Sequence, residues 1–403
     1  MAKSRKPRLL VLNQYYWPGV EATAQLLTEL CEALAQEFDV KVVTGVLHGH
    51  ETDPRQLVRN GVEITRVPST SFERSKILAR AANYVTYLSN ALVAGMRGPR
   101  PDVVVCMTDP PIVADIALVV ARRFRVPLVV ISQDVFPEIA IQLKRLENPA
   151  VMNVLRFLVS LYLRRADRVV AIGETMRERL EEKGARSGRV HVIPNWVDTQ
   201  RLQPLRKDNE WTHARRFDDK FVVMHSGNVG HAQDLDSLVR AGTFLRDLDD
   251  LVIAIIGMGA RHAELVGLAK LLEVDAVRFL YYQPRDVLQQ SLSAADVHVI
   301  GLAPGLAGYV VPSRLYGVLA VGRPMIAAAD PESETAQVVE RVGCGIVVPP
   351  GRPELLARAI RDAHDGKLDL EEMGARGRAW VELEADRSVA VRRYRDLLLE
   401  VAS

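Results

Sequence analysis

Two segments in the second half of the chain combine residue types that could bind an anion. The first, HSGNVGHAQDLDSLVRA at 225–241, predicts a strand, a turn with Gly227 and Gly230, and the start of a helix. Glycines let a ligand approach the backbone closely, and the free N–H groups and dipole of a helix start attract phosphate. A second glycine turn, which ends at Gly259, follows the next predicted strand. Simple chain reversal is the alternative explanation for the first turn.

A basic side chain lies where another helix is predicted to begin, in the segment VVPSRLYGVLAVGRPMIAA at 310–328. Pro312 and Ser313 are typical of a helix start and place Arg314 in the first turn. A cation at that position opposes the helix dipole unless an anion binds beside it. Arg314 is therefore a candidate anion ligand, and a solvated arginine is the alternative.

In the first half, Gln133 and Asp134 directly follow the apolar run 128–132, which predicts a buried strand. Ligands of open α/β sheets bind beyond the carboxyl ends of the strands. Asp134 could therefore orient an acceptor in a binding site or act as a local base there. The alternative is an N-cap aspartate for a helical segment that begins at Phe136.

These segments belong to a regular alternation of short apolar runs and helical-period stretches, which is typical of parallel α/β folds. Several runs are apolar on both faces, as in strands buried beneath helices on each side of a sheet. The predicted strands are 9–12, 40–44, 63–67, 103–107, 128–132, 169–172, 190–193, 221–226, 251–256, 277–281, 297–300, 324–328 and 345–348. The alternation breaks at 194–204, before the polar stretch 206–220. This break predicts a boundary between two doubly wound domains.

Composition and charge exclude several classes of protein. The chain has 403 residues, 48% of them hydrophobic and 25% charged, which suits two or three globular domains and excludes intrinsic disorder. A net charge of only +2 argues against a dedicated nucleic-acid binder. This net charge is the sum of +6 for residues 1–199 and −4 for residues 200–403. The difference is either random scatter or the mark of a first domain that faces an anionic surface.

Neither a metal site nor a membrane span is predicted. The three cysteines are far apart, and the one close histidine pair, His48 and His50, lacks carboxylates in a metal-binding spacing. The apolar run after the basic N-terminus is too short for a signal peptide, and no window approaches the roughly 20 apolar residues of a spanning helix. We expect a cytoplasmic protein, at most attached peripherally to the inner face of the cytoplasmic membrane.

An ordered set of motifs extends across residues 8 to about 360. In the second half it comprises GNVGHAQDL, FLYYQP, AAD, PSRLYG followed by AVGRP, and GCGIVVPP. In the first half it comprises NQYYWPG, PDV with DPP, QDVFPE, RRAD and IPNWVD. Together these motifs resemble the nucleotide-sugar-dependent glycosyltransferases of family 4, in the branch of bacterial surface-polysaccharide enzymes related to L-fucosamine transferases.

The resemblance implies a GT-B fold, which is an α/β architecture of two facing Rossmann-like domains with the active site in the cleft between them. Residues 1–199 would form the N-terminal acceptor-binding domain, and residues 200–385 the C-terminal domain that binds the nucleotide sugar. Residues 386–403 would form a last helix that packs back on the N-terminal domain. Its apolar residues have the spacing of a packed stripe: Val391, Tyr394, Leu397, Leu398 and Val401.

Candidate site residues follow from the resemblance together with the positions above. The catalytic candidates are Asp134 and Arg314. The donor-binding candidates are Gly227, Asn228, Gly230, Gln233, Gly259, Tyr282, Ser313, Arg314 and Glu334. The acceptor-binding candidates are Tyr16, Trp17, Gly19, Gln133, Asp134 and Glu138. The aromatic pair beside Gly19 suits stacking on a sugar or lipid, and core packing is the alternative for one of the two.

Two features that are common in the family are absent from this chain. The paired glutamates of its E-x7-E motif correspond to Tyr309 and Gly317, and the basic residue after the glycine turn is missing from 231–233. Arg314 then remains as the fixed cation for a diphosphate. Glu334 could contact the sugar or ribose, unless it is an exposed loop glutamate.

The implied activity is retaining transfer of a hexose-type sugar from a nucleotide diphosphate donor, UDP-linked on family grounds, to a lipid-linked or saccharide acceptor. No metal or other cofactor is expected. The basic amphipathic segments 72–94 and 151–168 suggest membrane contact through the N-terminal domain, or else buried helices with snorkelling arginines. The alternative functions are a sugar-nucleotide metabolic enzyme of the same fold, such as an epimerase, and a non-catalytic sugar-nucleotide-binding protein.

Overall fold

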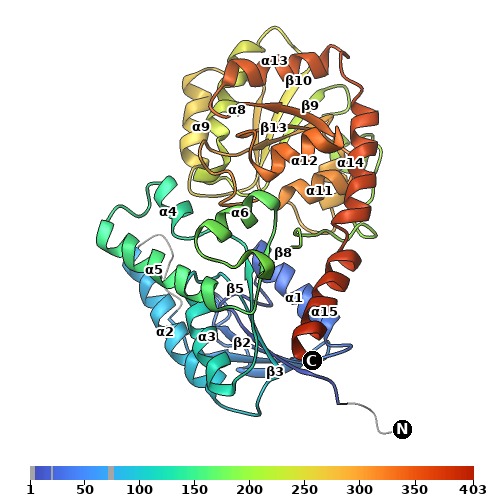
Figure 1. Cartoon of the computed structure of the whole chain (residues 1–403). Coiled ribbons are helices and arrows are strands. Elements are labelled where there is room, and N and C mark those ends of the chain that lie inside the picture. The colour runs from blue at the N-terminus through green and yellow to red at the C-terminus, as the bar shows by residue number, and fades with distance from the viewer. Residues whose placement is uncertain (1–4, 20, 71–76) are drawn as a thin grey trace. The chain divides into compact units, whose positions relative to one another are not determined.

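The computed structural model describes residues 5–19, 21–70 and 77–403 (Figure 1). Contacts between residues divide this chain into two units. The N-unit comprises the described residues up to Pro194 together with Ala390–Ser403, and the C-unit comprises Asn195–Val389. Each unit contains a largely parallel sheet with helices around it, so the predicted α/β class with two doubly wound domains is confirmed.

The N-unit contains an eight-stranded sheet in the order β3-β4-β2-β1-β5-β6-β7-β8. All neighbouring strands are parallel except β3 and β4. Its strands are β1 (Arg8–Leu12), β2 (Asp39–Gly45), β3 (Gln56–Arg59), β4 (Val62–Val67), β5 (Val103–Met107), β6 (Leu128–Ser132), β7 (Arg168–Ala171) and β8 (Val190–Val192). Every residue of β5 and β6 is buried, as expected for strands covered on both faces.

The edge strand β3 is absent from the sequence-based prediction. It forms an antiparallel hairpin with β4 through Asn60 and Gly61, whose φ angles of 47° and 83° are both positive. Asn-Gly is the dipeptide that such a two-residue turn favours. The strand has four residues and a largely exposed Val58, so the continuous apolar run that identified the other strands is missing.

The helices of the N-unit connect successive parallel strands. They are α1 (Ala22–Leu34), α2 (Ile77–Met96), α3 (Val113–Phe124), α4 (Glu138–Gln142), α5 (Pro149–Arg165) and α6 (Glu174–Glu182). Along one side, α2 packs on α3 and α3 packs on α5 (Figure 1). The last helix, α15 (Arg387–Ala402), buries Tyr394, Leu397 and Leu398 of the predicted stripe, and Arg168 of β7 donates to Glu400 at 2.5 Å.

The C-unit contains a six-stranded parallel sheet in the order β11-β10-β9-β12-β13-β14. Its strands are β9 (Phe221–Ser226), β10 (Leu251–Ile256), β11 (Val277–Leu280), β12 (Val297–Gly301), β13 (Met325–Ala328) and β14 (Gly345–Val348). The chain starts at β9 in the middle, builds outward to β11, and then returns to the other side of β9 with β12. The carboxyl ends of β9 and β12 therefore flank a topological switch point, where ligands of open α/β sheets bind.

Alternate residues of the C-unit strands point to opposite faces of the sheet, and helices cover both faces. Val223 and Ile253 lie in one buried cluster with α8 (Leu235–Ala241), α9 (His262–Leu271) and α13 (Pro353–His364). Val222 and Val252 lie in another cluster, with Trp211 of α7 (Glu210–His213). The remaining helices are α10 (Leu288–Ser293), α11 (Arg314–Ala320), α12 (Glu334–Val342) and α14 (Leu370–Glu384).

No helix formed by the residues that the structure describes is both long enough and apolar enough to cross a membrane. The longest, α2, has 20 residues. The expected segment 72–94 falls partly on residues 71–76, which lie outside the described residues.

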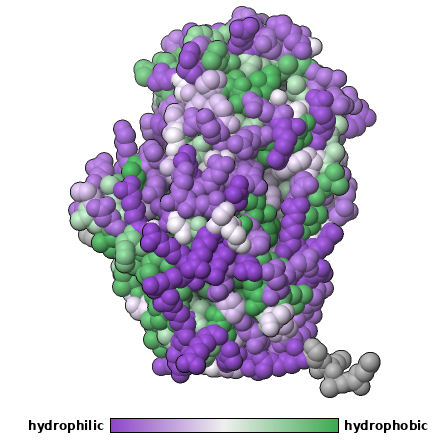
Figure 2. All heavy atoms as spheres, in the orientation of Figure 1, coloured by the Kyte–Doolittle hydropathy of each residue, from purple (hydrophilic) through white to green (hydrophobic). Residues whose placement is uncertain are grey.

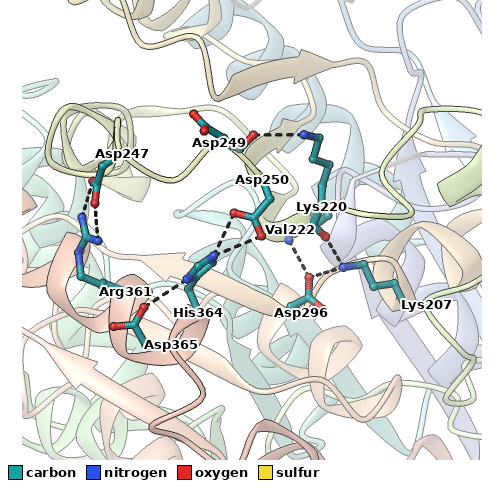
Figure 3. Close-up of polar contacts among 10 residues, drawn as sticks. All are labelled: Lys207, Lys220, Val222, Asp247, Asp249, Asp250, Asp296, Arg361, His364 and Asp365. Carbon is teal, nitrogen blue, oxygen red and sulfur yellow. Dashed lines mark hydrogen bonds and ion pairs between the residues drawn. The ribbon is translucent and has the colours of Figure 1, made fainter.

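A polar network ties together the amino ends of the C-unit strands, at the edge opposite the switch point (Figure 3). Asp296, directly before β12, accepts hydrogen bonds from the Val222 N–H at 2.7 Å and from Lys207 Nζ at 2.5 Å. At the end of α13, His364 Nε2 lies 3.0 Å from Asp250 Oδ1 and Nδ1 lies 3.3 Å from Asp365 Oδ1. These contacts hold strand ends in place, so we assign the network to stability.

His364 gives this network a predicted pH dependence. Partial burial lowers its pKa, but the carboxylates of Asp250 and Asp365 outweigh that effect and raise the pKa above its ordinary value. A raised folded-state pKa gives a stability contribution that is complete below the unfolded-state pKa and is lost as pH rises through the folded-state pKa. His364→Gln should therefore reduce the free energy of unfolding at pH 5.5 by about 0.5–1 kcal/mol, the scale of a solvent-screened ion pair.

Urea denaturation at pH 5.5, 7.0 and 8.5 measures this effect, and the difference between the variant and the wild type should shrink as pH rises. His262→Gln is the matched control, because His262 packs edge-on against Phe279 at 5.5 Å and forms no ion pair with a described residue. A difference for His364→Gln that grows with pH would contradict the prediction.

Candidate functional site

Two glycine turns meet at the carboxyl ends of β9 and β10. Gly227 and Gly257 have φ angles of 147° and 136°, a region that residues with side chains rarely adopt. A Cβ atom on Gly257 would lie 1.9 Å from the Gly227 carbonyl oxygen, and one on Gly259 would lie 2.3 Å from the Val229 carbonyl oxygen. The two turns therefore pack backbone against backbone, and the packing requires glycine at these positions.

Hydrogen bonds within the protein occupy most of the N–H groups of the first turn. The Gly227 N–H donates to the Ile256 carbonyl at 2.9 Å, and the Val229 N–H donates to the Met258 carbonyl at 3.0 Å. The Gly230 N–H donates to Gln233 Oε1 at 3.0 Å. These contacts correct the expectation that the whole turn offers free N–H groups to a phosphate. Gln233 holds the turn by capping it, and among the four amides only that of Asn228 has no partner in the described part of the chain.

Arg314 brings a cation to the same place. It is the first residue of α11, and its guanidinium lies against the first turn, so that a Cβ on Gly227 would be 3.3 Å from Arg314 Nε. Its Nη1 lies 2.9 Å from both ring nitrogens of His225. Desolvation lowers the pKa of Arg314 to about 10, which still leaves it charged at neutral pH. No carboxylate of a described residue forms an ion pair with it.

Tyr282, Ser313 and Glu334 lie at the same end of the C-unit sheet. Tyr282 follows β11, keeps 54% of its surface exposed, and donates its hydroxyl hydrogen bond to the Met258 carbonyl at 3.2 Å. Ser313 is exposed directly before Arg314. Glu334 begins α12 after β13 and is only 9% exposed, so the alternative of an exposed loop glutamate is wrong. The structure thus groups Gly227, Asn228, Gly259, Tyr282 and Arg314 closely.

His225 is the residue of this site that sequence reasoning missed. It is completely buried near the end of β9 and contacts Arg314 directly. Burial and the neighbouring Arg314 hold its pKa well below the ordinary value, so the ring is neutral. The available signal was a histidine within an apolar strand, two residues before the glycine turn.

In the N-unit, Asp134 lies just beyond the carboxyl end of β6. Its backbone carbonyl accepts a hydrogen bond from Ser132 Oγ at 3.2 Å, while its carboxylate contacts no hydrogen-bond donor of a described residue. The helix that follows, α4, is capped at Pro137 without a side-chain hydrogen bond, so the N-cap alternative for Asp134 is wrong. The side chain is open to water, yet the surrounding protein atoms desolvate the carboxylate and raise its pKa to about 6.

The two members of the predicted aromatic pair lie in the loop after β1 and differ in solvent exposure. Tyr16 is fully buried in the core, which corrects its assignment to acceptor binding, because a buried ring cannot stack on a ligand. Trp17 is half-buried, with the guanidinium carbons of Arg59 and Arg66 at 4.8 Å and 5.5 Å from its ring centre. Gly19 closes the loop by donating its N–H to the Tyr16 carbonyl at 2.8 Å. Trp17 is thus the member of the pair that remains accessible.

The other two acceptor candidates beside Asp134 are held by the protein itself. Gln133 is buried, and its backbone N–H donates to Thr108 Oγ1 at 3.1 Å. Glu138 begins α4 and accepts from Lys183 Nζ at 2.5 Å and from Arg156 Nε at 3.2 Å. These ion pairs correct the assignment of Glu138 to acceptor binding, because its carboxylate already links α4 to neighbouring elements.

One group of side chains in the described ranges could hold a metal ion, formed by Asp208, His213 and Asp218. All three are exposed around α7, and each nitrogen of His213 already faces a carboxylate. None of them is a predicted donor or acceptor residue.

Comparisons with known proteins bear on both units. Residues 21–196 match the family described as Glycosyl transferase 4-like domain, and residues 207–380 match the family described as Glycosyl transferases group 1. WbjE of Pseudomonas aeruginosa, described as a probable glycosyltransferase, is 25% identical over 397 residues, which is 96% of each chain. WcaI of Escherichia coli K12 carries a provisional description as a glycosyl transferase of colanic acid biosynthesis. It is 29% identical over 58% of this chain and 57% of its own.

The fold is also that of solved structures. The crystal structure of HepE from Anabaena in complex with UDP-glucose superposes with a TM-score of 0.75 at 16% identity, over 98% of this chain and 99% of HepE. At this identity the likeness concerns the fold alone. It confirms the predicted GT-B class of two Rossmann-like domains.

Proposed function

Because the chain belongs to the family 4 glycosyltransferases of GT-B fold, we propose that it transfers a sugar from a nucleotide diphosphate donor to a lipid-linked or saccharide acceptor in surface-polysaccharide synthesis. The observation that carries this proposal is Arg314, a desolvated cation without a carboxylate partner among the described residues, beside the glycine turns at the switch point. A partly buried, desolvated charge of this kind is costly unless a ligand of opposite charge compensates it.

The donor is proposed to bind in the C-unit with its diphosphate at Arg314. As the bond between the sugar and the diphosphate breaks, negative charge grows on the leaving phosphate. A fixed cation in a water-poor site stabilises that charge without reorganising during the reaction. Tyr282, which lies against Gly257, and the exposed Tyr281 before it are proposed to lie beside the nucleoside. UDP is the proposed nucleotide, in line with the UDP-glucose bound by HepE.

The acceptor is proposed to meet the N-unit at Asp134. This carboxylate has no hydrogen-bond partner among the described residues, and with a pKa of about 6 it is ionised at neutral pH and can accept the proton of an acceptor hydroxyl. Family membership suggests retention of configuration, in which the hydroxyl attacks from the face that the diphosphate leaves. The relationship to L-fucosamine transferases stays a prediction, since the descriptions of WbjE and WcaI name no sugar.

We also propose that α5 contacts an anionic membrane surface. Val159, Tyr162 and Leu163 bury one face of the helix, while the other exposes Val151, Val154 and Phe157, with Phe157 66% exposed. Arg164 and Arg165 are exposed in the last turn. Figure 2 shows apolar surface interspersed with hydrophilic side chains over this part of the N-unit. Apolar residues flanked by arginines are typical of interfacial helices.

Replacing Phe157 with glutamate tests this membrane contact. Burying a phenylalanine side chain contributes roughly 1.5–3 kcal/mol, so Phe157→Glu should reduce sedimentation with phosphatidylglycerol-containing liposomes at least about tenfold. Phe244→Glu is the matched control, because Phe244 is 53% exposed in the C-unit outside α5. Binding by the wild type should also weaken with salt. Wild-type protein that stays in the supernatant at low salt would refute the contact.

A panel of UDP-, GDP- and dTDP-sugars tests the proposed function as a whole. The wild type should show a thermal shift and slow donor hydrolysis with one nucleotide class, and transfer when a lipid-linked acceptor is added. An epimerase would convert the donor sugar without releasing nucleotide, and a non-catalytic binding protein would give the thermal shift alone. No response to any member of the panel would overturn the proposal.

A further inference from the structure

His225 occupies an unusual position for a buried histidine. It lies near the carboxyl end of β9, is fully buried, and places both ring nitrogens 2.9 Å from Nη1 of Arg314. The same guanidinium lies against Gly227, two residues later in the chain. His225 therefore supports Arg314 from inside the sheet, at the turn that forms the proposed donor site.

The ring of His225 has three polar neighbours. Nε2 lies 3.4 Å from the Asn228 carbonyl oxygen, and the Val299 carbonyl is a second acceptor for the ring. Arg314 Nη1 lies equally close to both ring nitrogens. A neutral ring is consistent with this arrangement, since an imidazolium would offer Arg314 two donors and a second positive charge.

The choice of a neutral partner has an electrostatic consequence. Buried arginines are normally paired with carboxylates, which fix their geometry but also cancel their charge. The partly buried Arg261 of the C-unit shows the same kind of pairing, with Asp236 and Glu264 both bound to its guanidinium. The His225 ring contacts the Arg314 guanidinium without a negative charge and so leaves the charge of Arg314 uncompensated.

We propose that His225 is a positioning residue that holds Arg314 for the donor diphosphate while leaving the full charge of the guanidinium available to it. This role rests on the proposed function, because it assumes that Arg314 meets a nucleoside diphosphate. It extends that function to a residue that itself touches no ligand. A purely structural histidine is found next to it: His298 in β12 is equally buried, and its Nε2 contacts only the Leu292 carbonyl at 2.9 Å.

An isosteric pair of variants separates orientation from charge. Asparagine at position 225 retains a neutral oxygen acceptor near the place of Nδ1, whereas aspartate adds a negative charge at the same point. Calorimetric titration with UDP should give an affinity for His225→Asn within about threefold of the wild type. His225→Asp should bind UDP about 30-fold or more weakly, because a carboxylate in contact with Arg314 neutralises its attraction for the diphosphate.

The pairing with Arg314 is tested by repeating both variants in an Arg314→Ala background. There the ratio of UDP affinities between the asparagine and aspartate variants should fall below about threefold, since a double-mutant cycle isolates the contact. His298→Asn is the matched control for loss of a buried imidazole and should leave UDP affinity unchanged once the protein is folded. Equal ratios with and without Arg314 would overturn the role of His225.

A measurement on the unmodified protein covers the case in which position 225 tolerates no substitution. In ¹⁵N-histidine-labelled wild type, the His225 ring should be neutral, both alone and with saturating UDP. An imidazolium signal in either state would overturn the proposal. Wild-type protein that binds neither UDP nor another nucleoside diphosphate would overturn the proposed donor, and the role of His225 with it. UDP binding that is insensitive to His225→Asp would overturn this role alone.

Discussion

Arg314→Ala is expected to lower kcat/KM for sugar transfer by about 100-fold to 1,000-fold, the range found when one preorganised donor to a developing oxyanion is removed. The physical reason is that Arg314 is a desolvated cation at the switch point of the C-unit, with no described carboxylate to compete for it. Charge that grows on the leaving phosphate would lose its fixed partner. Initial rates with the donor identified by the nucleotide-sugar panel give the measurement.

Arg240→Ala is the matched control for the same change in charge. Arg240 is exposed in the last turn of α8, and its side chain forms no hydrogen bond or ion pair with a described residue. Its replacement should leave kcat/KM within about twofold and thermal stability unchanged. A loss of less than about fivefold for Arg314→Ala, near 1 kcal/mol, would remove Arg314 from the proposed mechanism.

The second large effect is expected for Asp134→Asn, which should reduce kcat about 100-fold to 10,000-fold by removing a general base. The fold should not suffer, because the structure shows no hydrogen bond to this carboxylate from a described residue and α4 is capped elsewhere. A carboxyl group whose folded-state pKa is raised to about 6 stabilises the fold less as pH rises through that value. The variant should therefore be as stable as the wild type at pH 7.5, or slightly more stable.

A pH profile distinguishes a base from an orienting group. The wild-type kcat/KM should fall tenfold for each pH unit below about 6, as Asp134 becomes protonated. Above about pH 6 the wild-type kcat/KM should not change with pH. The Asp134→Asn variant should show no such fall below pH 6. Asp39→Asn is the control, since Asp39 is exposed at the start of β2, at the amino edge of the same sheet. A fall in melting temperature for Asp134→Asn with normal turnover would instead indicate a structural role.

Most strand positions in this protein can be predicted from runs of apolar residues in the sequence. Strands buried on both faces need continuous apolar runs, so β5, β6, β10 and β13 appear as short stretches such as 251–256. The edge strand β3 needs no such run, because one of its sides faces solvent. Only its pairing with β4 through the Asn60-Gly61 turn identifies it as a strand.

Site residues were predictable where function depends on the backbone or on a helix start. Gly227 and Gly259 were identified because only glycine permits such close approach, and Arg314 because its position conflicts with the helix dipole. Side chains on loops were less predictable. Tyr16 and Trp17 are neighbours in sequence, yet one is buried in the core and the other remains accessible, since adjacent residues of an extended loop point in different directions.

The amino-acid sequence by itself determined the two α/β units, their strands other than β3, and the glycine turns, because these depend on local patterns of apolar residues and on backbone freedom. Only the tertiary structure decided which polar groups are already satisfied. In the folded protein Glu138 forms ion pairs with Lys183 and Arg156, and three amides of the first turn donate hydrogen bonds within the protein. The carboxylate of Asp134 has no hydrogen-bond partner among the described residues. The tertiary structure also placed His225 under Arg314, across 89 residues of chain. Such contacts join distant segments, so no local pattern encodes them.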